Sequence, residues 1–344
     1  MKKRAQIFFA DRLSPLTGGV EMHAEAFIRY FSEHSLYPII KIIKEPFEER
    51  SLGEESLILF FNSGRWIEQM KTIRSQNPTA KIVYRTGGNE IIKAPLTYYL
   101  HSHKRRQAIW IKILNETVNY MITNSSFTEK RLRNLGLTVP FLRCVGGVNY
   151  TSSTENSKKN SKGVTFFSAA RFVPYKNHNL LINIFNEFHR QGREYTLTLA
   201  GDGPLLNQMI ANAKGNPKIT FLGRCENYVV LQQVMNADVY IQLSSDYKTK
   251  VPGGFYIHTE GMGRSILEAI SLGTYVVAGR CGALQEIITP EIGKLVSPDS
   301  FGDIMKTLQT IFDCQPKKKS PTDIFNWNYI FKQYENLYES FDCN

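Results

Sequence analysis

The sequence predicts an α/β protein made of two domains of similar size. Short apolar segments of strand length alternate with helical ones, which is typical of parallel sheets covered by helices on both faces. A polar stretch, 151–162, interrupts this alternation, which then restarts. A chain of 344 residues is also too long for one ordinary core. We therefore expect domains at residues 1–150 and 163–324, joined by a linker at 151–162.

The first half contains five segments that we expect to form strands, because each is short and apolar and they alternate with helical segments. They are Ala5–Ala10, Pro38–Ile43, Leu57–Phe61, Lys81–Tyr84 and Asn119–Thr123, and the segments Phe141–Val145 and Gly146–Asn149 close the half. Helical spacing of apolar residues after Gly19, and an N-cap at Ser125 or Ser126, predict two of the intervening helices. The loop Arg85–Glu90 leaves the fourth strand at the edge where open α/β sheets bind ligands.

The second half repeats this organisation. Its predicted strands are Val164–Ser168, Tyr195–Ala200, Lys218–Gly223, Ala237–Gln242 and Thr274–Ala278. After the first of them, Leu181, Ile184 and Phe185 recur at helical spacing. Residues 325–344 carry a further apolar face at the same spacing, and predict a separate C-terminal helix.

Composition limits the class of protein. Hydrophobic residues make up 42% of the chain and charged residues 21%, as in soluble globular proteins. The apolar run at the start ends at Asp11, too early for a signal peptide, and no apolar run is long enough to span a bilayer. The 5 cysteines are scattered. They favour a reducing cytoplasm over a disulfide framework or a zinc site.

Positive charge is concentrated in the first half. Residues 1–150 hold 22 Lys and Arg against 13 Asp and Glu, within a formal net charge of +11 for the chain. Basic runs such as 2–4 and 104–106 predict contact with an anionic surface, for which a membrane is the candidate. The alternative is an ordinary solvated basic face. We expect no nucleic-acid partner, because no recognition motif accompanies these runs.

One stretch of the second half, Gly253–Glu286, combines the features of a ligand site. Glu260 lies at the N-terminal mouth of a predicted helix, and Glu268 lies eight positions on, along the same face. Gly261 and Gly263 let a ligand approach the backbone, and free N–H groups at the helix start favour an anion. Carboxylates can bind the hydroxyls of a sugar nucleotide, and backbone amides can bind its phosphates, so this combination suits such a ligand. Two solvated glutamates after a glycine-rich turn are the alternative.

These motifs resemble those of the group 1 (family 4) retaining glycosyltransferases of GT-B fold. Glu260 and Glu268 match the pair of glutamates of that family, and Arg171 and Lys176 match its phosphate-clamping cations. Further matches occur in sequence order over nearly the whole chain, at Gly18–Gly19, Asn124–Ser125, Gly146–Asn149, Ala200–Pro204, Leu222–Gly223 and the C-terminal helix. The resemblance implies two Rossmann-like domains facing across a cleft, with residues 325–344 crossing back onto the first domain.

The resemblance also implies roles for individual residues. Arg171 and Lys176 would hold the leaving diphosphate of a nucleoside-diphosphate sugar, as a bidentate fork and a point charge. Glu260 would bind hydroxyls of the donor sugar, and Glu268 those of the ribose. The other implied donor contacts are Gly18 and Gly19 at the diphosphate, Gly223, Arg224 and Cys225 at the base, and Gly261, Met262, Gly263, Arg264 and Ser265 at sugar and phosphate. We expect that the protein needs no cofactor. We also expect transfer to be metal-independent, because the cationic pair can balance the charge of the diphosphate.

The chain departs from the family pattern in three places. The family's histidine after the fourth strand is absent; we expect Asn89 or a backbone group to act there, and rank His101 and His103 below them. Met262 stands where an aromatic residue is usual. Residues 245–259 form an unusually long link, which is either a lid beside the donor sugar or a plain surface insertion.

We therefore expect a retaining glycosyltransferase in the cytoplasm or at the inner face of the membrane. The donor would be a UDP-sugar by preference, with a GDP-sugar as the other option. The acceptor would be a saccharide or lipid-linked saccharide in cell-surface polysaccharide or lipopolysaccharide synthesis. A nucleotide-sugar epimerase of GT-B fold and a non-catalytic nucleotide-sugar-binding protein are the alternatives.

Overall fold

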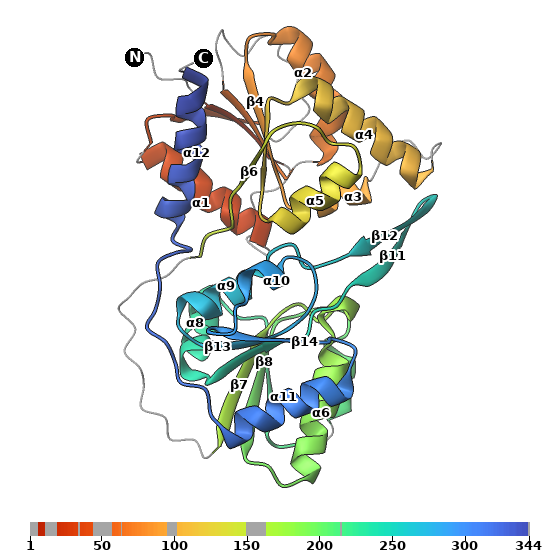
Figure 1. Cartoon of the computed structure of the whole chain (residues 1–344), viewed down its shortest axis with the longest axis vertical. Coiled ribbons are helices and arrows are strands. Elements are labelled where there is room, and N and C mark those ends of the chain that lie inside the picture. The colour runs from red at the N-terminus through yellow and green to blue at the C-terminus, as the bar shows by residue number, and fades with distance from the viewer. Residues whose placement is uncertain are drawn as a thin grey trace. The chain divides into compact units, whose positions relative to one another are not determined.

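A computed structural model of the chain divides it into two compact units, each with its own sheet (Figure 1). The first unit comprises Met1–Gly147, Lys248–Ile257 and Trp327–Asn344, and the second comprises Val148–Tyr247 and His258–Asn326. The structure describes residues 6–10, 19–33, 35–43, 57–62, 64–94, 102–148, 163–213 and 215–342. The expected linker, Gly18, His101 and the basic run at 2–4 lie outside these residues.

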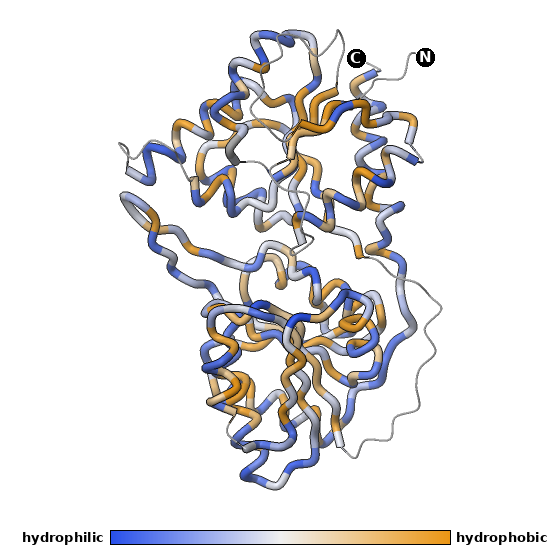
Figure 2. The backbone as a smooth tube through the Cα atoms, turned by 180° about the vertical axis from the view of Figure 1, so that it is seen from behind, coloured by the Kyte–Doolittle hydropathy of each residue, from blue (hydrophilic) through white to orange (hydrophobic). Residues whose placement is uncertain are grey.

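The first unit is built on a sheet of six parallel strands in the order β2-β1-β3-β4-β5-β6. The strands are β1 (Gln6–Ala10), β2 (Ile39–Ile43), β3 (Leu57–Phe61), β4 (Lys81–Thr86), β5 (Tyr120–Thr123) and β6 (Phe141–Arg143). Every residue of β1 and β3 is buried, as expected where helices cover both faces of a parallel sheet. Figure 2 shows the same pattern as apolar colour along the strands.

Helices of the first unit follow the strands, and a late segment of the chain joins them. They are α1 (Gly19–Glu33), the 3-10 helix Gly64–Gln69, α2 (Met70–Gln76), α3 (Asn89–Lys93), α4 (His103–Thr117), α5 (Ser126–Asn134) and α12 (Trp327–Asp342). Helix α12 packs beside α1, where the Phe27 and Phe331 rings meet edge to face with centroids 5.4 Å apart (Figure 1). Ser35 Oγ donates to Glu335 at 2.7 Å nearby. This confirms that the C-terminal helix returns to the first domain.

The second unit contains another parallel sheet, in the order β14-β13-β10-β7-β8-β9. Its strands are β7 (Val164–Ala169), β8 (Tyr195–Ala200), β9 (Ile219–Gly223), β10 (Val239–Gln242), β13 (Tyr275–Gly279) and β14 (Gly293–Val296). Its helices are the 3-10 helix Pro174–Lys176, α6 (His178–Arg190), α7 (Leu206–Ala213), α8 (Asn227–Asn236), α9 (Arg264–Ser271), α10 (Leu284–Ile287) and α11 (Phe301–Asp313). Each unit is thus Rossmann-like, a parallel sheet with helices between most successive strands.

The long link before Glu260 forms a β-hairpin of β11 (Tyr247–Val251) and β12 (Gly254–His258). Only Pro252 and Gly253 join the strands, so they must run antiparallel. Gly253 has a φ of +71°, and proline followed by such a glycine is typical of a type II turn. By its contacts, Lys248–Ile257 belongs to the first unit. The hairpin is therefore an ordered element, where the sequence predicted either a lid or a surface insertion.

Arg106 attaches the turn of this hairpin to α4. Its side chain is only 2% exposed, and it donates from Nε to the Ala94 carbonyl at 3.1 Å and from Nη2 to the Pro252 carbonyl at 2.6 Å. The sequence grouped Arg106 with Lys104 and Arg105 in an exposed basic run. That grouping was wrong for Arg106, because two backbone carbonyls occupy its guanidinium.

Two negative findings concern the described residues alone. No helix among them is long and apolar enough to cross a membrane. Within the same ranges, no three His, Cys, Asp or Glu side chains gather closely enough to hold a metal ion.

Replacing Arg106 with methionine is expected to destabilise the first unit by about 3 kcal/mol, because it leaves two buried carbonyls without a charged donor. The free energy of unfolding, measured by urea denaturation, checks this. The exposed neighbour supplies a matched control, Arg105→Met, which should change stability by less than about 0.5 kcal/mol. Equal effects of the two substitutions would contradict the role of Arg106.

Candidate functional site

The polar residues of the second unit gather at the carboxyl end of its sheet. Strands β7 and β10 are neighbours, so the loops that follow them leave the sheet side by side. One loop carries Arg171 and Lys176, and the other leads through Ser244 towards Glu260. This is the edge at which open α/β sheets bind ligands.

Lys176 and Glu260 form an ion pair at the centre of the site. The Lys176 ammonium lies 2.5 Å from Glu260 Oε2, and both side chains are largely buried. Ser244 Oγ donates to the same oxygen at 3.2 Å. Burial alone would raise the pKa of Glu260, but the Lys176 charge and the hydrogen bonds hold that pKa below its ordinary value. Glu260 is therefore a carboxylate at neutral pH.

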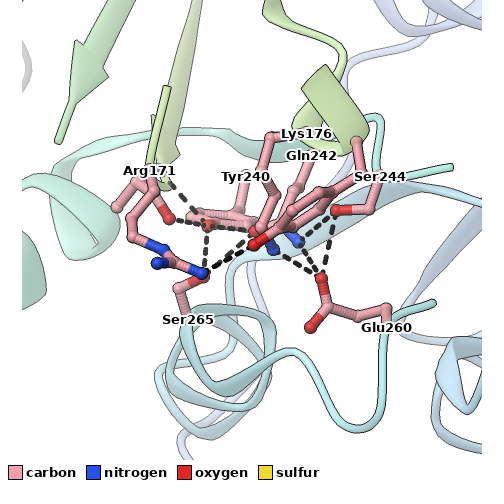
Figure 3. A network of polar contacts seen from close by, with 9 residues as sticks. Arg171, Lys176, Tyr240, Gln242, Ser244, Glu260 and Ser265 are labelled. Atoms are coloured by element: carbon pink, nitrogen blue, oxygen red, sulfur yellow. Dashed lines mark hydrogen bonds and ion pairs between the residues drawn. The ribbon is translucent and has the colours of Figure 1, made fainter. Parts of the chain in front are cut away.

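Three further side chains connect this carboxylate to the start of α9 (Figure 3). Gln242 is 1% exposed; its Nε2 donates to Glu260 Oε2 at 3.3 Å, and its Oε1 accepts from Ser265 Oγ at 3.1 Å. The buried Tyr240 hydroxyl lies 2.7 Å from the same Ser265 Oγ and 3.0 Å from the Ala169 carbonyl. Ser265 is thereby positioned by strand β10.

Glycine at 282 brings a second loop against the backbone of Glu260. The Glu260 carbonyl accepts from Ala283 N at 3.0 Å. A Cβ on Gly282 would lie 2.0 Å from that carbonyl oxygen, and the φ of Gly282 is +52°. Only glycine tolerates both conditions. The position of Glu260 therefore depends on the turn after β13.

Glu268 is held separately, inside α9. Its Oε1 accepts from Arg264 Nη2 at 3.0 Å and from Asn227 Nδ2 at 3.1 Å. Glu268 is only 4% exposed, and burial raises its pKa despite the Arg264 charge and the Asn227 amide. Helix α9 begins after Gly263, whose φ of +71° makes the sharp entry, and no side chain caps that start.

Each glutamate of the pair engages the protein through a single oxygen. Glu260 uses Oε2 for Lys176, Ser244 and Gln242, and Glu268 uses Oε1 for Arg264 and Asn227. Across the described ranges, the remaining oxygen of each carboxylate accepts no side-chain hydrogen bond. Both carboxylates can therefore still accept hydrogen bonds from a ligand.

Arg171 is exposed beside this network, and its Nη2 donates to the Tyr175 hydroxyl at 2.6 Å. The Tyr175 ring also lies against the His258 ring, with centroids 3.9 Å apart and the ring planes tilted by 37°. Lys176 follows Tyr175 directly. The two predicted cations thus lie on one loop of the second unit, with Glu260 in contact with Lys176.

Other predicted donor residues are more widely spread. Gly223 ends β9, the edge strand of the second sheet, and Arg224 and Cys225 follow it. Gly261 and Met262 lie between Glu260 and α9. Gly19 begins α1 and Asn89 begins α3, both in the first unit. Their contact with a donor stays a prediction.

His103 is structural. It is the first residue of α4, and it is buried, with Nε2 2.9 Å from the Ile92 carbonyl. The low rank of His103 as a candidate for the missing catalytic histidine stays a prediction. Sequence reasoning also missed five residues that position the site: Asn227, Tyr175, Tyr240, Gln242 and Ser244. A glutamine in an apolar strand was the available signal for Gln242, because buried polar side chains need partners.

Substituting Gly282 with alanine is expected to destabilise the protein by roughly 3 kcal/mol, because the new Cβ meets the Glu260 carbonyl in a left-handed backbone conformation. Thermal and urea unfolding check this. Gly302 provides the control, since an added Cβ there meets nothing within 4 Å. Gly302→Ala, in helix α11, should stabilise the protein slightly. A neutral Gly282→Ala would contradict the proposed backbone constraint.

Comparison with known proteins assigns the chain to a family. Residues 150–323 match the model of the group 1 glycosyl transferases. The chain is 22% identical over 270 residues to the GDP-mannose-dependent monoacylated alpha-(1-6)-phosphatidylinositol monomannoside mannosyltransferase of Corynebacterium glutamicum, covering 74% of this chain and 67% of that protein. It is 23% identical over 195 residues to the phosphatidylinositol N-acetylglucosaminyltransferase gpi3 subunit of Schizosaccharomyces pombe, covering 54% of this chain and only 40% of that protein.

Solved structures agree on the fold. Sucrose-phosphate synthase from Thermosynechococcus elongatus superposes with a TM-score of 0.75 at 15% identity, covering 99% of both chains. Anabaena Alr3699/HepE in complex with UDP-glucose gives a TM-score of 0.69 at 17% identity, covering 98% of this chain and 99% of that one. The family match covers half of the chain and contains Arg171, Lys176, Glu260 and Glu268. The chain belongs to the group 1 glycosyltransferases.

Proposed function

We propose that the protein is a retaining glycosyltransferase that uses a nucleoside-diphosphate sugar, preferably a UDP-sugar, as donor. The observation that carries this proposal is the arrangement of Glu260 and Glu268, each bonded to side chains of the described residues through one carboxylate oxygen. These glutamates accompany the cationic loop of Arg171 and Lys176. Anabaena HepE, a neighbour in fold, was solved with UDP-glucose. The Corynebacterium relative is described as GDP-mannose-dependent, which keeps a GDP-sugar as the second option.

Lys176 can serve the donor without leaving Glu260. An ammonium has three N–H donors, and Glu260 Oε2 takes one of them. The other two can face the diphosphate, where Arg171 adds a second cation. Negative charge develops on this diphosphate as the glycosyl bond breaks, so prepositioned cations stabilise the transition state more than the ground state. We propose that this pair makes a metal ion unnecessary.

Glu260 and Glu268 then orient the two sugars of the donor. The free Oε1 of Glu260 would accept from hydroxyls of the transferred sugar, and the free oxygen of Glu268 would accept from the ribose. Gln242 and Ser244 hold the Glu260 carboxylate in one orientation by bonding only its other oxygen. Orientation by such contacts lowers the entropic part of the barrier.

The acceptor is proposed to be a saccharide or a lipid-linked saccharide in glycolipid or cell-surface polysaccharide synthesis. Two relatives carry phosphatidylinositol-linked acceptors in their names. We propose that the enzyme works in the cytoplasm, at the inner face of the membrane.

Nucleotide binding is expected to raise the thermal stability of the protein. A ligand at 100 times its dissociation constant adds about 2.7 kcal/mol to the free energy of unfolding. A thermal-shift screen of UDP, GDP and their sugars checks this. Lys176→Met should reduce the shift, whereas the exposed lysine of α11 offers a control, Lys306→Met, that should preserve it. The absence of any shift with all nucleotides would overturn the donor assignment.

Glu260→Gln is expected to lower kcat/KM by about 100-fold, a loss typical for one oriented group at a reacting centre.

Product analysis by NMR should show retention of the donor's anomeric configuration, and EDTA should leave the rate unchanged. Nucleotide binding without turnover, with any acceptor class, would favour a non-catalytic binding protein. Sugar isomerisation without acceptor would favour an epimerase.

A further inference from the structure

One face of the β11–β12 hairpin combines cationic and apolar side chains at the surface. Side chains alternate between the faces of a strand, and the two-residue turn pairs Val251 with Gly254. Lys248, Lys250, Phe255 and Ile257 therefore share a face, which we call the outer face. Phe255 is 50% exposed and Ile257 is 38% exposed, and both lysines are exposed as well.

The outer face is organised by contacts among its own side chains. The Lys248 ammonium lies 3.9 Å from the centre of the Phe255 ring, within the range of a cation–π interaction. Residues 247–258 contain no Asp or Glu, so no acidic residue of the hairpin neutralises its lysines. The opposite face is used internally: Tyr256 is half-buried and packs against the core of the first unit. The hairpin is thus amphipathic, with its unburied apolar side chains beside its cations.

The hairpin is anchored to the first unit at both ends of β12. Besides the Arg106 bond to Pro252, the Gly253 carbonyl accepts from His103 N at 3.2 Å, at the start of α4. Arg131 of α5 donates from Nη2 to the Ile257 carbonyl at 2.8 Å. Because α4 begins at the hairpin turn, the exposed Lys104 and Arg105 lie close to that turn. Cations of three elements therefore lie on or beside the hairpin.

A plain surface hairpin explains only part of this arrangement. Lysines commonly protect a strand edge against pairing with another chain, so Lys248 and Lys250 alone carry no functional signal. Exposing Phe255 and Ile257 on the neighbouring strand, opposite these lysines, weakens that protection. Aromatic and aliphatic side chains next to lysines are typical of elements that lie in the headgroup region of an anionic bilayer.

We propose that the outer face of the hairpin docks on an anionic lipid surface. Phe255 and Ile257 enter the boundary between headgroups and acyl chains, while Lys248 and Lys250 bind lipid phosphates. This inference rests on the proposed transfer to a lipid-linked acceptor, and adds the surface through which the enzyme reaches it. Positive charge on the hairpin complements the negative charge of the lipid. The anchoring at Pro252 and Gly253 already orders the hairpin, so binding does not have to offset the entropy lost in ordering it.

Sedimentation of the full-length protein with phosphatidylcholine vesicles, with and without 30% phosphatidylglycerol, tests the proposal. Wild type should bind only the anionic vesicles, and less tightly as salt rises. Each lysine near an anionic surface contributes about a fivefold factor in partitioning, so Lys248→Glu with Lys250→Glu should lower the partition coefficient at least 25-fold. Phe255→Ser with Ile257→Ser should lower it as well, and leave the residual binding more sensitive to salt.

Matched controls separate the hairpin from total charge and from catalysis. Lys306→Glu with Lys317→Glu removes the same charge from exposed positions of the second unit, and should leave vesicle binding within about twofold of wild type. The nucleotide-induced thermal shift should be the same in all variants, which shows that they are folded. Unchanged vesicle binding by both hairpin variants, or equal loss in the control, would refute the docking surface while leaving the glycosyltransferase proposal intact. Failure of the nucleotide shift in wild type would instead refute the donor site.

Discussion

The site depends on the burial of the Lys176–Glu260 ion pair. Removing both charges from water is costly, and their attraction compensates only when the remaining hydrogen-bonding capacity is also satisfied. Ser244 and Gln242 satisfy Oε2 of Glu260, the oxygen that Lys176 contacts, and leave Oε1 available for a ligand. Lys176 lies in the loop after β7, whereas Gln242 ends β10 and Ser244 follows it, so the pair holds the segments after β7 and β10 in one arrangement. The glycine at 282 then fixes the backbone of Glu260 from a third loop.

The two glutamates of the motif occupy different electrostatic environments. Glu260, beside an ammonium, has its pKa lowered, whereas burial raises the pKa of Glu268 although Arg264 is adjacent. The two carboxylates of one motif therefore differ in the direction of their pKa shifts. In the proposed mechanism, Glu260 holds hydroxyls of the transferred sugar next to the developing charge, and the more deeply buried Glu268 holds the ribose. The difference arises from the lysine that the loop after β7 contributes.

The hairpin shows how an insertion can acquire order without a core of its own. A two-stranded hairpin alone is marginally stable in water. Here the side chains of Arg106 and Arg131 and the backbone N–H of His103 donate to its backbone carbonyls, so that two arginines of the first unit become structural. Its outer face is then free to expose Phe255 and Ile257. Charge counting by sequence segment could not make this distinction, because it treats Arg105 and Arg106 alike.

The sequence by itself determined the parallel α/β architecture, the strands β1 to β5, β7 to β10 and β13 within a few residues, and the family motifs at Arg171, Lys176, Glu260 and Glu268. Local periodicity and turn chemistry are sufficient for these features, because they depend on neighbouring residues. Only the tertiary structure decided that Gln242, Tyr240 and Tyr175 support the site, that residues 245–259 form a hairpin, and that β14 completes the second sheet. These outcomes depend on contacts between residues far apart in the chain, where burial and the need to pair polar atoms override local preference.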